Sequence, residues 1–204
     1  AGLCAGLGGD APGGGGHGGR GGGAVAGETC DDIMAPTKAG SGGGASAGAA
    51  GGSGGGVVWI EAWGSVRIDG RVGADGMSGE RDGGGGAGGS VFLVCNSLSG
   101  IGTISANGAP GSGTGAGGGG GRISMWDGIP SEERARNPKA VLDEPERPHW
   151  YGVPWTRYER MRAGDLSEVD VSANCRTFGG TVTADGGASA GTVRSYTLQP
   201  ETQK

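Results

Sequence analysis

The sequence lacks several features on which functional assignments often rest. No apolar run approaches the roughly 18 residues needed to span a bilayer, and the chain does not open with the charged and apolar regions of a signal peptide. The formal net charge is −5, and Lys and Arg are dispersed rather than gathered into a stripe. These absences argue against membrane insertion and against a nucleic-acid partner. Because the chain starts at Ala1 without Met, we expect a mature product or a piece of a longer protein.

Motifs for metals and nucleotides are also missing. The two histidines, His17 and His149, are isolated from one another and from any cluster of Cys, His or carboxylate residues. Matches to GxGxxG arise by chance in a chain with 54 glycines, and none follows a strand and opens a helix as a dinucleotide site requires. We therefore expect no cofactor and no metal.

There are four cysteines and no CxxC pair. The absence of this close spacing disfavours zinc knuckles and thioredoxin-like sites. An even number in a secreted chain indicates two disulfides, for which three connectivities exist. Proximity in sequence favours Cys4–Cys30, and Cys95–Cys175 then follows. Cys95 and Cys175 also precede equivalent repeat motifs, so in neighbouring coils they fall within the Cα separation that a disulfide requires.

Glycine is the dominant residue, with 54 of 204 positions. Such a chain folds only if other segments bury apolar surface and the backbone hydrogen bonds are satisfied. Apolar residues do gather in short clusters, which disordered chains lack. These clusters are predicted to be strands and cover residues 57–63, 65–72, 90–95, 102–105, 122–126, 169–175, 180–184 and 191–198.

A short motif recurs three times, as "GRVGADG" (70–76), "GTISANG" (102–108) and "GTVTADG" (180–186). Each copy predicts a short strand that ends in a tight turn, since Asp-Gly and Asn-Gly tolerate positive φ. The first two copies are separated by one period of the length typical of solenoids. We therefore predict an all-β, glycine-rich parallel β-helix or solenoid.

The third copy lies further away than one period, which indicates an insertion over residues 127–168. The insertion is rich in Pro and in both charges, and we expect an irregular arm. Residues 54–126 are then solenoid coils, and residues 169–204 form the final coil and tail. Residues 1–53 have no strand signal, and we expect them to cap the first coil.

Two glycine-rich stretches, residues 76–89 and 108–121, recur at equal length between equivalent strands. The lengths of disordered linkers would be free to differ. We interpret them as ordered parts of the coils, in which glycine allows close approach of backbones and extended polyglycine stretches bond to one another.

The motifs "GGGGHGGRGGG", "GGGVVWIEAWGSVRIDGRVGADG", "GGSVFLVCNSLSGIGTISANG", "GGGGGRISMW" and "FGGTVTADGG" occur in this order. Together they resemble the glycine-rich repeat regions of very large secreted or cell-surface proteins of bacteria, protists and algae. The resemblance implies a β-solenoid module of an extracellular structural or adhesive protein without enzymatic activity, and flagellar hairs called mastigonemes are one setting for it. The arm departs from this pattern, so its contacts are specific to this chain.

The best candidate contact residues lie in the arm, in the stretch "HWYGVPWTRYERMR". Aromatic residues interleaved with arginine have the composition of protein-interface hot spots, and they also stack on sugar rings. The alternative is that they only cover the side of the solenoid. The candidates are Trp150, Tyr151, Trp155, Arg157, Tyr158, Arg160 and Arg162.

Because parallel β-helices also host polysaccharide lyases and hydrolases, we considered the carboxylates Asp69, Asp75 and Asp185. Asn107 occupies the equivalent position in the middle copy, and an exchange of Asp for Asn suits a turn better than a catalytic centre. An ice-binding polyglycine bundle would require Gly at every third position, and the strands interrupt that frame.

The sequence thus predicts a non-enzymatic structural module of an extracellular or cell-surface assembly, whose partners are other copies or other chains that bind at coil ends and at the 127–168 arm. The alternative is a carbohydrate-binding or adhesive module that uses the aromatic cluster.

Overall fold

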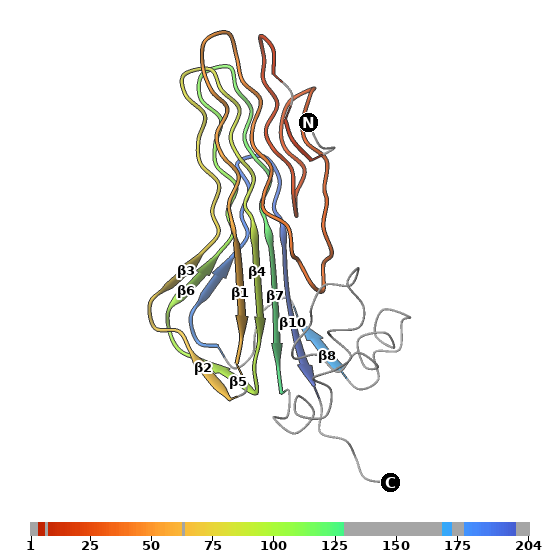
Figure 1. Ribbon diagram of the computed structural model, residues 1–204, viewed down its shortest axis with the longest axis vertical. Helices are drawn as coiled ribbons and strands as arrows, with labels where there is room; N and C mark the ends of the chain where they lie inside the picture. The colour runs from red at the N-terminus through yellow and green to blue at the C-terminus, as the bar shows by residue number, and fades with distance from the viewer. Residues whose placement is uncertain (1–3, 7, 63, 129–168, 173–177, 199–204) are drawn as a thin grey trace, which may run out of the picture.

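The computed structural model describes residues 4–6, 8–62, 64–128, 169–172 and 178–198. Within these ranges the chain forms strands and extended segments and no helix, which confirms the all-β prediction. Figure 1 shows the strands at one end of an elongated molecule and wavy extended segments at the other. The strands are β1 (Val57–Glu61), β2 (Ser65–Arg67), β3 (Arg71–Gly73), β4 (Ser90–Val94), β5 (Ser97–Ser99), β6 (Thr103–Ser105), β7 (Arg122–Asp127), β8 (Val169–Ser172), β9 (Thr181–Thr183) and β10 (Thr192–Leu198).

The strands form three sheets with the orders β1-β4-β7-β10-β8, β2-β5 and β3-β6-β9. All pairs are parallel except β10 with β8, which is antiparallel. In the parallel pairs each strand thus lies beside its counterpart in the next repeat, and Arg71, Thr103 and Thr181 are neighbours. The three copies of the sequence motif are therefore neighbours in space.

The core lies between the three sheets. Alternate residues of β4 and β7, among them Val91 and Ile123, point into it and meet Leu98 of β5 and Ile104 of β6. All four side chains are at most 1% exposed. Because side chains alternate along a strand, the residues between them point to the opposite face of the large sheet. There Phe92 packs edge-on against Trp59 of β1, and Trp126 stacks on Tyr196 of β10.

The glycine-rich residues between the strands form a second part of the fold, which we call the glycine bundle (residues 8–29, 39–56, 74–89, 106–121 and 184–191). Residues 84–89 show its hydrogen bonding most clearly. Their successive N–H groups point to three different neighbouring segments, and every third one returns to the same segment. The donor and acceptor pairs, with distances of 2.7–3.0 Å, are Gly84 to Gly44, Ala87 to Ser41, Gly85 to Ala116, Gly88 to Gly119, Gly86 to Met77 and Gly89 to Ala74.

This repeat of three residues is the periodicity of extended helices that make no internal hydrogen bonds and must bond to their neighbours. Carbonyl groups of the same segment accept from further segments, for example that of Gly85 from the N–H of Gly15. The expected polyglycine pairing is therefore present. The strands interrupt the frame of Gly at every third position, so the whole chain is not a polyglycine bundle. The glycine segments between the strands nevertheless form one.

Close packing explains why glycine is needed in this bundle. A Cβ atom on Gly14 would lie 1.8 Å from the carbonyl oxygen of Gly117, and one on Gly85 would lie 2.2 Å from that of Ala109. Such contacts are well inside van der Waals distance, so any larger residue would push the segments apart.

Residues 12–19 lie inside this bundle and are all buried. They exchange backbone hydrogen bonds with Gly22, Gly44, Gly85 and Gly120, which belong to four different segments. This part of the N-terminal region is thus an interior element of the bundle. The expectation that residues 1–53 cap the first coil, like the rest of the proposed division into domains, stays a prediction.

The repeat motifs were expected to end in tight turns with positive φ, and this expectation is wrong. Neither Asp75, Asn107 and Asp185 nor the glycines that follow them have positive φ. The chain instead continues extended into the glycine bundle, and the Asp and Asn side chains serve a different purpose, which is described below.

Candidate functional site

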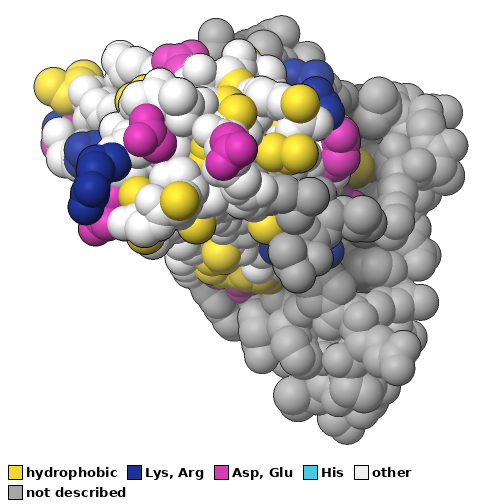
Figure 2. All heavy atoms as spheres, turned by 90° about the horizontal axis from the view of Figure 1, so that it is seen from above, with side chains coloured by type: hydrophobic (Ala, Val, Ile, Leu, Met, Phe, Trp, Pro, Cys, Tyr) yellow, Lys and Arg dark blue, Asp and Glu magenta, His cyan; other side chains and the backbone are white. Residues whose placement is uncertain are grey.

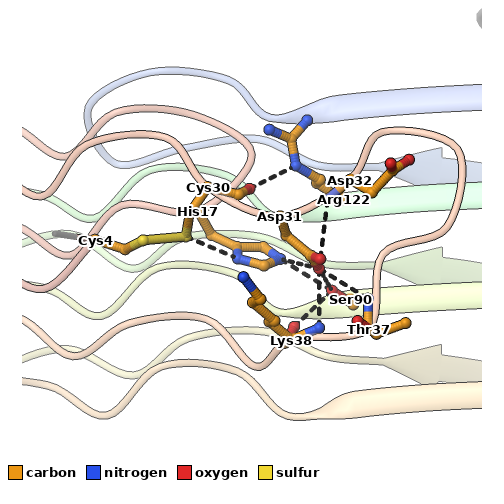
Figure 3. Close-up of a disulfide and its surroundings, with 9 residues drawn as sticks. All are labelled: Cys4, His17, Cys30, Asp31, Asp32, Thr37, Lys38, Ser90 and Arg122. Atoms are coloured by element: carbon orange, nitrogen blue, oxygen red, sulfur yellow. Dashed lines mark hydrogen bonds and ion pairs between the residues drawn. A yellow bond between two sulfur atoms is a disulfide. The ribbon is translucent and has the colours of Figure 1, made fainter. Parts of the chain in front are cut away.

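The seven aromatic and arginine residues predicted to contact partners lie in residues 129–168, outside the described residues, and their role stays a prediction. Cys175 also lies outside the described residues, so its pairing with the buried Cys95 stays a prediction as well. The predicted Cys4–Cys30 disulfide is confirmed, with a Cα–Cα distance of 6.2 Å. It adjoins the most elaborate group of polar side chains that the structure describes (Figure 3).

His17 is at the centre of this group and is 0% exposed. Its Nε2 lies 2.9 Å from Oγ of Ser90 and 3.7 Å from Oδ2 of Asp31. Its Nδ1 faces the disulfide and lies 3.7 Å from Sγ of Cys30. We call His17, Ser90, Asp31, Cys4 and Cys30 the His17 cluster. It joins the centre of the glycine bundle to the first residue of β4.

The hydrogen bonds of Ser90 determine which nitrogen of His17 carries the proton. Ser90 has one hydroxyl proton, and its Oγ lies 2.6 Å from the carbonyl oxygen of Lys38, which can only accept. The Ser90 hydroxyl therefore donates to Lys38, and the Nε2–H of His17 donates to Ser90. In the neutral imidazole Nδ1 is then the unprotonated nitrogen, and it faces the disulfide.

Asp31 holds the loop that follows the disulfide. It has a positive φ of 73°, and its Oδ2 accepts hydrogen bonds of 2.8 and 2.9 Å from the N–H groups of Thr37 and Lys38. Its neighbour Asp32 accepts from the N–H of Met34 at 2.7 Å. Two adjacent carboxylates thus fold residues 31–38 into a closed loop.

This loop covers the outer face of the large sheet. Arg122 of β7 donates from Nε to the carbonyl oxygen of Cys30 at 2.8 Å. Ser124 and Trp126, also of β7, donate to the carbonyl oxygen of Met34 at 2.6 and 3.0 Å. The polar residues of a buried strand therefore satisfy the backbone of the loop, which explains a buried arginine and serine in the middle of the sheet.

Burial lowers the pKa of His17 to about 4, with Asp31 acting in the opposite direction and Arg122 and Lys38 reinforcing the shift. Burial also lowers the pKa of Arg122, against the attraction of Asp31 and Asp32. His17 is therefore neutral at physiological pH, and because Nε2 carries its one proton, Nδ1 is unprotonated.

Ser90, His17 and Asp31 are the residue types of a hydrolytic triad, but their geometry is not that of a triad. In a triad the serine bonds to one imidazole nitrogen and the carboxylate accepts from the other. Here Ser90 and Asp31 both lie on the Nε2 side, while Nδ1 faces a sulfur atom. Ser90 and His17 are both 0% exposed, so a substrate has no access to them in this conformation.

Asp69, Asp75 and Asp185 were considered as catalytic carboxylates, and the structure shows Asp75, and Asn107 at the equivalent position, as hydrogen-bond acceptors between repeats. Oδ1 of Asp75 accepts from the backbone N–H of Asn107 at 2.7 Å, and Oδ1 of Asn107 accepts from the N–H of Asp185 at 2.8 Å. Asp69 and Asp82 accept in the same way from residues 32 positions later. These side chains form ladders that fix the register between repeats.

β1, β2 and β3, the first strand of each parallel sheet, have one edge without a neighbouring strand among the described residues. On β2 and β3 the edge carries the arginines Arg67 and Arg71, which are paired with Asp69 and Asp75. The first four residues of β1 are Val, Val, Trp and Ile, and Val57 is 42% exposed. β1 is thus a mainly apolar edge, and its one charged residue is Glu61 at the end of the strand.

Figure 2 shows the molecule from above, with small groups of acidic, basic and apolar side chains scattered over a largely white surface and with basic side chains beside acidic ones.

Two further observations concern the described part of the chain. No group of three or more His, Cys, Asp or Glu side chains is arranged to hold a metal ion while the disulfide is closed. No helix there is long and apolar enough to cross a membrane. Comparison with protein-family models, with curated proteins and with solved structures finds no match.

Proposed function

We propose that this protein is a non-enzymatic structural module of an extracellular or cell-surface assembly, and that it contacts neighbouring molecules through the open edge of its first repeat and through the 127–168 arm. The observation that carries the proposal is the mainly apolar edge of β1, which has no neighbouring strand among the described residues. An edge of this kind pairs with another strand unless the protein blocks it.

We interpret the three sheets as the sides of a short solenoid whose coils begin at β1, β4 and β7. The in-register parallel pairs and the ladder of Asp75 and Asn107 support this interpretation. In such an array each coil rests on the next, and the terminal coils need covering. At the edge of the large sheet opposite to β1, β8 pairs with β10 in antiparallel orientation and covers that edge. β1 has no such partner among the described residues.

The hydrogen-bonding direction of β1 supports a second copy of the chain as the occupant. The N–H of Ala62 and the carbonyl of Gly56 bond to the β4 side, so alternation directs the N–H groups of Val57 and Trp59 away from it. In an antiparallel pair of two β1 strands centred on Trp59, Trp59 lies opposite its own copy and Val58 lies opposite Ile60. Apolar residues then face one another at the centre of the pair, and Val57 lies opposite Glu61 at each end.

The extracellular location is supported by the Cys4–Cys30 disulfide, since disulfides persist mainly in oxidising compartments. The resemblance to glycine-rich repeat regions of secreted and cell-surface proteins, and to mastigoneme-type filaments among them, remains part of this proposal. A close-packed bundle in which backbone groups bond to several neighbours suits a stiff load-bearing module.

The test compares the natural chain with Val57→Pro and the matched control Val57→Thr by sedimentation velocity over a range of concentrations without reductant. Proline removes the outward N–H of β1 but is tolerated at an edge, whereas threonine retains the donor. We expect the natural chain and Val57→Thr to associate with rising concentration and Val57→Pro to shift toward the monomer. A natural chain that stays monomeric throughout would overturn the β1 contact.

A further inference from the structure

The lone pair on Nδ1 of His17 is an unusual feature of the buried interior. In the neutral ring the one proton is on Nε2, which donates to Ser90, so Nδ1 is unprotonated, and the atom it faces is Sγ of Cys30 at 3.7 Å. A sulfur in a disulfide carries no proton, so it cannot donate to Nδ1. A strong acceptor on a fully buried side chain is thus aimed at two bonded sulfur atoms.

We propose that reduction of the Cys4–Cys30 disulfide creates a zinc site, in which the thiolates of Cys4 and Cys30 and Nδ1 of His17 bind one Zn²⁺. Two cysteines and one histidine are an established ligand set for this ion. The inference does not depend on the structural role proposed above.

The chemistry has two steps. A small dithiol transfers two electrons and two protons to the disulfide by thiol–disulfide exchange, and is itself oxidised to a cyclic disulfide. Zn²⁺ then displaces the two thiol protons into solvent and forms two Zn–S bonds, while the Nδ1 lone pair supplies the third bond. Two thiolates neutralise the dication, so the site adds no net charge to the interior.

The geometry already present suits this ligand set. With Zn–S near 2.3 Å and Zn–N near 2.0–2.1 Å at tetrahedral angles, the sulfur and nitrogen ligands lie about 3.6 Å apart. Sγ of Cys30 and Nδ1 of His17 are 3.7 Å apart. Upon reduction the two sulfur atoms are free to move apart, and the Cα atoms of Cys4 and Cys30 at 6.2 Å can remain in place.

The groups behind the histidine also match a metal site. A histidine that binds a metal through one nitrogen nearly always donates its other N–H to an oxygen, which fixes the ring. Here Ser90 accepts that hydrogen bond at 2.9 Å, Lys38 holds Ser90 in turn, and Asp31 lies 3.7 Å from the same nitrogen. Cys4 and Cys30 are only partly buried, so the ion can reach the sulfurs and keep a water ligand.

The experiment is a titration of the reduced full chain with Co²⁺, whose bonds to thiolates give a charge-transfer absorption in the near ultraviolet, followed by displacement with Zn²⁺. We expect one Co²⁺ per reduced chain and none for the oxidised chain. Cys95→Ser/Cys175→Ser should keep the absorption, and Cys4→Ser/Cys30→Ser should lose it. This pair of variants separates the proposed ligands from the other two cysteines.

Two variants test the role of the imidazole. His17→Gln should weaken Co²⁺ binding strongly, and Ser90→Ala, which leaves all three ligands in place, should weaken it about tenfold. Equal affinity of His17→Gln and the natural chain would overturn the assignment of Nδ1. Absence of the absorption in the reduced natural chain, or its persistence in Cys4→Ser/Cys30→Ser, would overturn the site.

If reduction loosens the fold, amide hydrogen exchange of residues 12–19 gives a second measurement. The proposal then predicts that Zn²⁺ restores their protection in the reduced natural chain and not in Cys4→Ser. Failure to restore protection in the natural chain would equally overturn the site.

Discussion

The carboxylate oxygen Oδ1 of Asp75 accepts a hydrogen bond of 2.7 Å from the backbone N–H of Asn107, 32 residues later in the chain. Asn107 then offers its own Oδ1 to the N–H of Asp185 at 2.8 Å. Each side chain thus replaces a backbone acceptor between successive repeats. The position requires an acceptor oxygen at a fixed place and does not require a charge.

Substitution of Asp75 tests this requirement. Asp75→Asn keeps the acceptor and should change the free energy of unfolding by less than about 0.5 kcal/mol, because the exposed ion pair with Arg71 contributes little. Asp75→Ala leaves the N–H of Asn107 without this acceptor and should cost about 1 kcal/mol or more. Urea unfolding measures both, and an equal loss for Asn and Ala would show that charge matters instead.

Close packing of the glycine bundle predicts a sharp contrast between two alanine substitutions. Gly85→Ala places a Cβ 2.2 Å from the carbonyl oxygen of Ala109, and should destabilise the protein by about 3 kcal/mol. Gly56→Ala meets no atom within 4 Å and lies just before β1, so it should be neutral or slightly stabilising. Thermal unfolding of the two variants decides the matter, and similar melting temperatures would contradict the packing.

The lowered pKa of His17 predicts a pH dependence of stability. Burial lowers the pKa to about 4 in the folded protein from an ordinary value of 6.5, so the unfolded chain binds the proton more readily. The contribution of neutral His17 to the free energy of unfolding is therefore complete above pH 6.5. It should be lost as the pH falls toward 4, by about 3 kcal/mol in total.

The control for this pH dependence is His17→Gln, which cannot titrate in this range. The difference in unfolding free energy between the natural chain and the variant should fall between pH 6.5 and 4, which removes the contribution of other carboxylates. A difference independent of pH would mean that His17 does not stay neutral when buried.

Loss of the Cys4–Cys30 disulfide should destabilise the protein by about 3–4 kcal/mol, since the bond closes a loop with a sequence separation of 26. Cys4→Ser/Cys30→Ser measured by denaturant unfolding without reductant gives this value and leaves Cys95 and Cys175 unchanged. No loss of stability would show that the hydrogen bonds of residues 12–19 hold the N-terminal region without covalent help.

Much of the strand arrangement could be predicted from the sequence. The recurrence of "GRVGADG", "GTISANG" and "GTVTADG" predicted the neighbours of the β3-β6-β9 sheet, and the apolar clusters marked every strand except β5. β5 was missed because Ser97, Leu98 and Ser99 include no β-branched residue and lie outside the repeated motif. β3, β6 and β9 also have one large apolar residue each, but the motif marked them.

The His17 cluster could not be predicted. A single histidine among glycines carries no periodic signal, and its partner Ser90 is 73 residues away. The hint available was the pair Asp31 and Asp32 directly after Cys30, since adjacent carboxylates before a short loop favour side-chain to backbone hydrogen bonds. The three-residue period of the glycine bundle could not be predicted either, because it is a period of the hydrogen bonds between segments. In a run of glycines all residues are identical, so the sequence does not indicate which neighbouring segment each one bonds to.

The most direct test of the account is electron microscopy of the concentrated protein under non-reducing conditions, with Val57→Pro imaged beside the natural chain. The account predicts regular oligomers or filaments of the natural chain, with the β1 edges of neighbouring molecules in contact, and their loss in Val57→Pro. Isolated, uniform monomers of the natural chain would contradict the proposal that this protein is a module of an assembly.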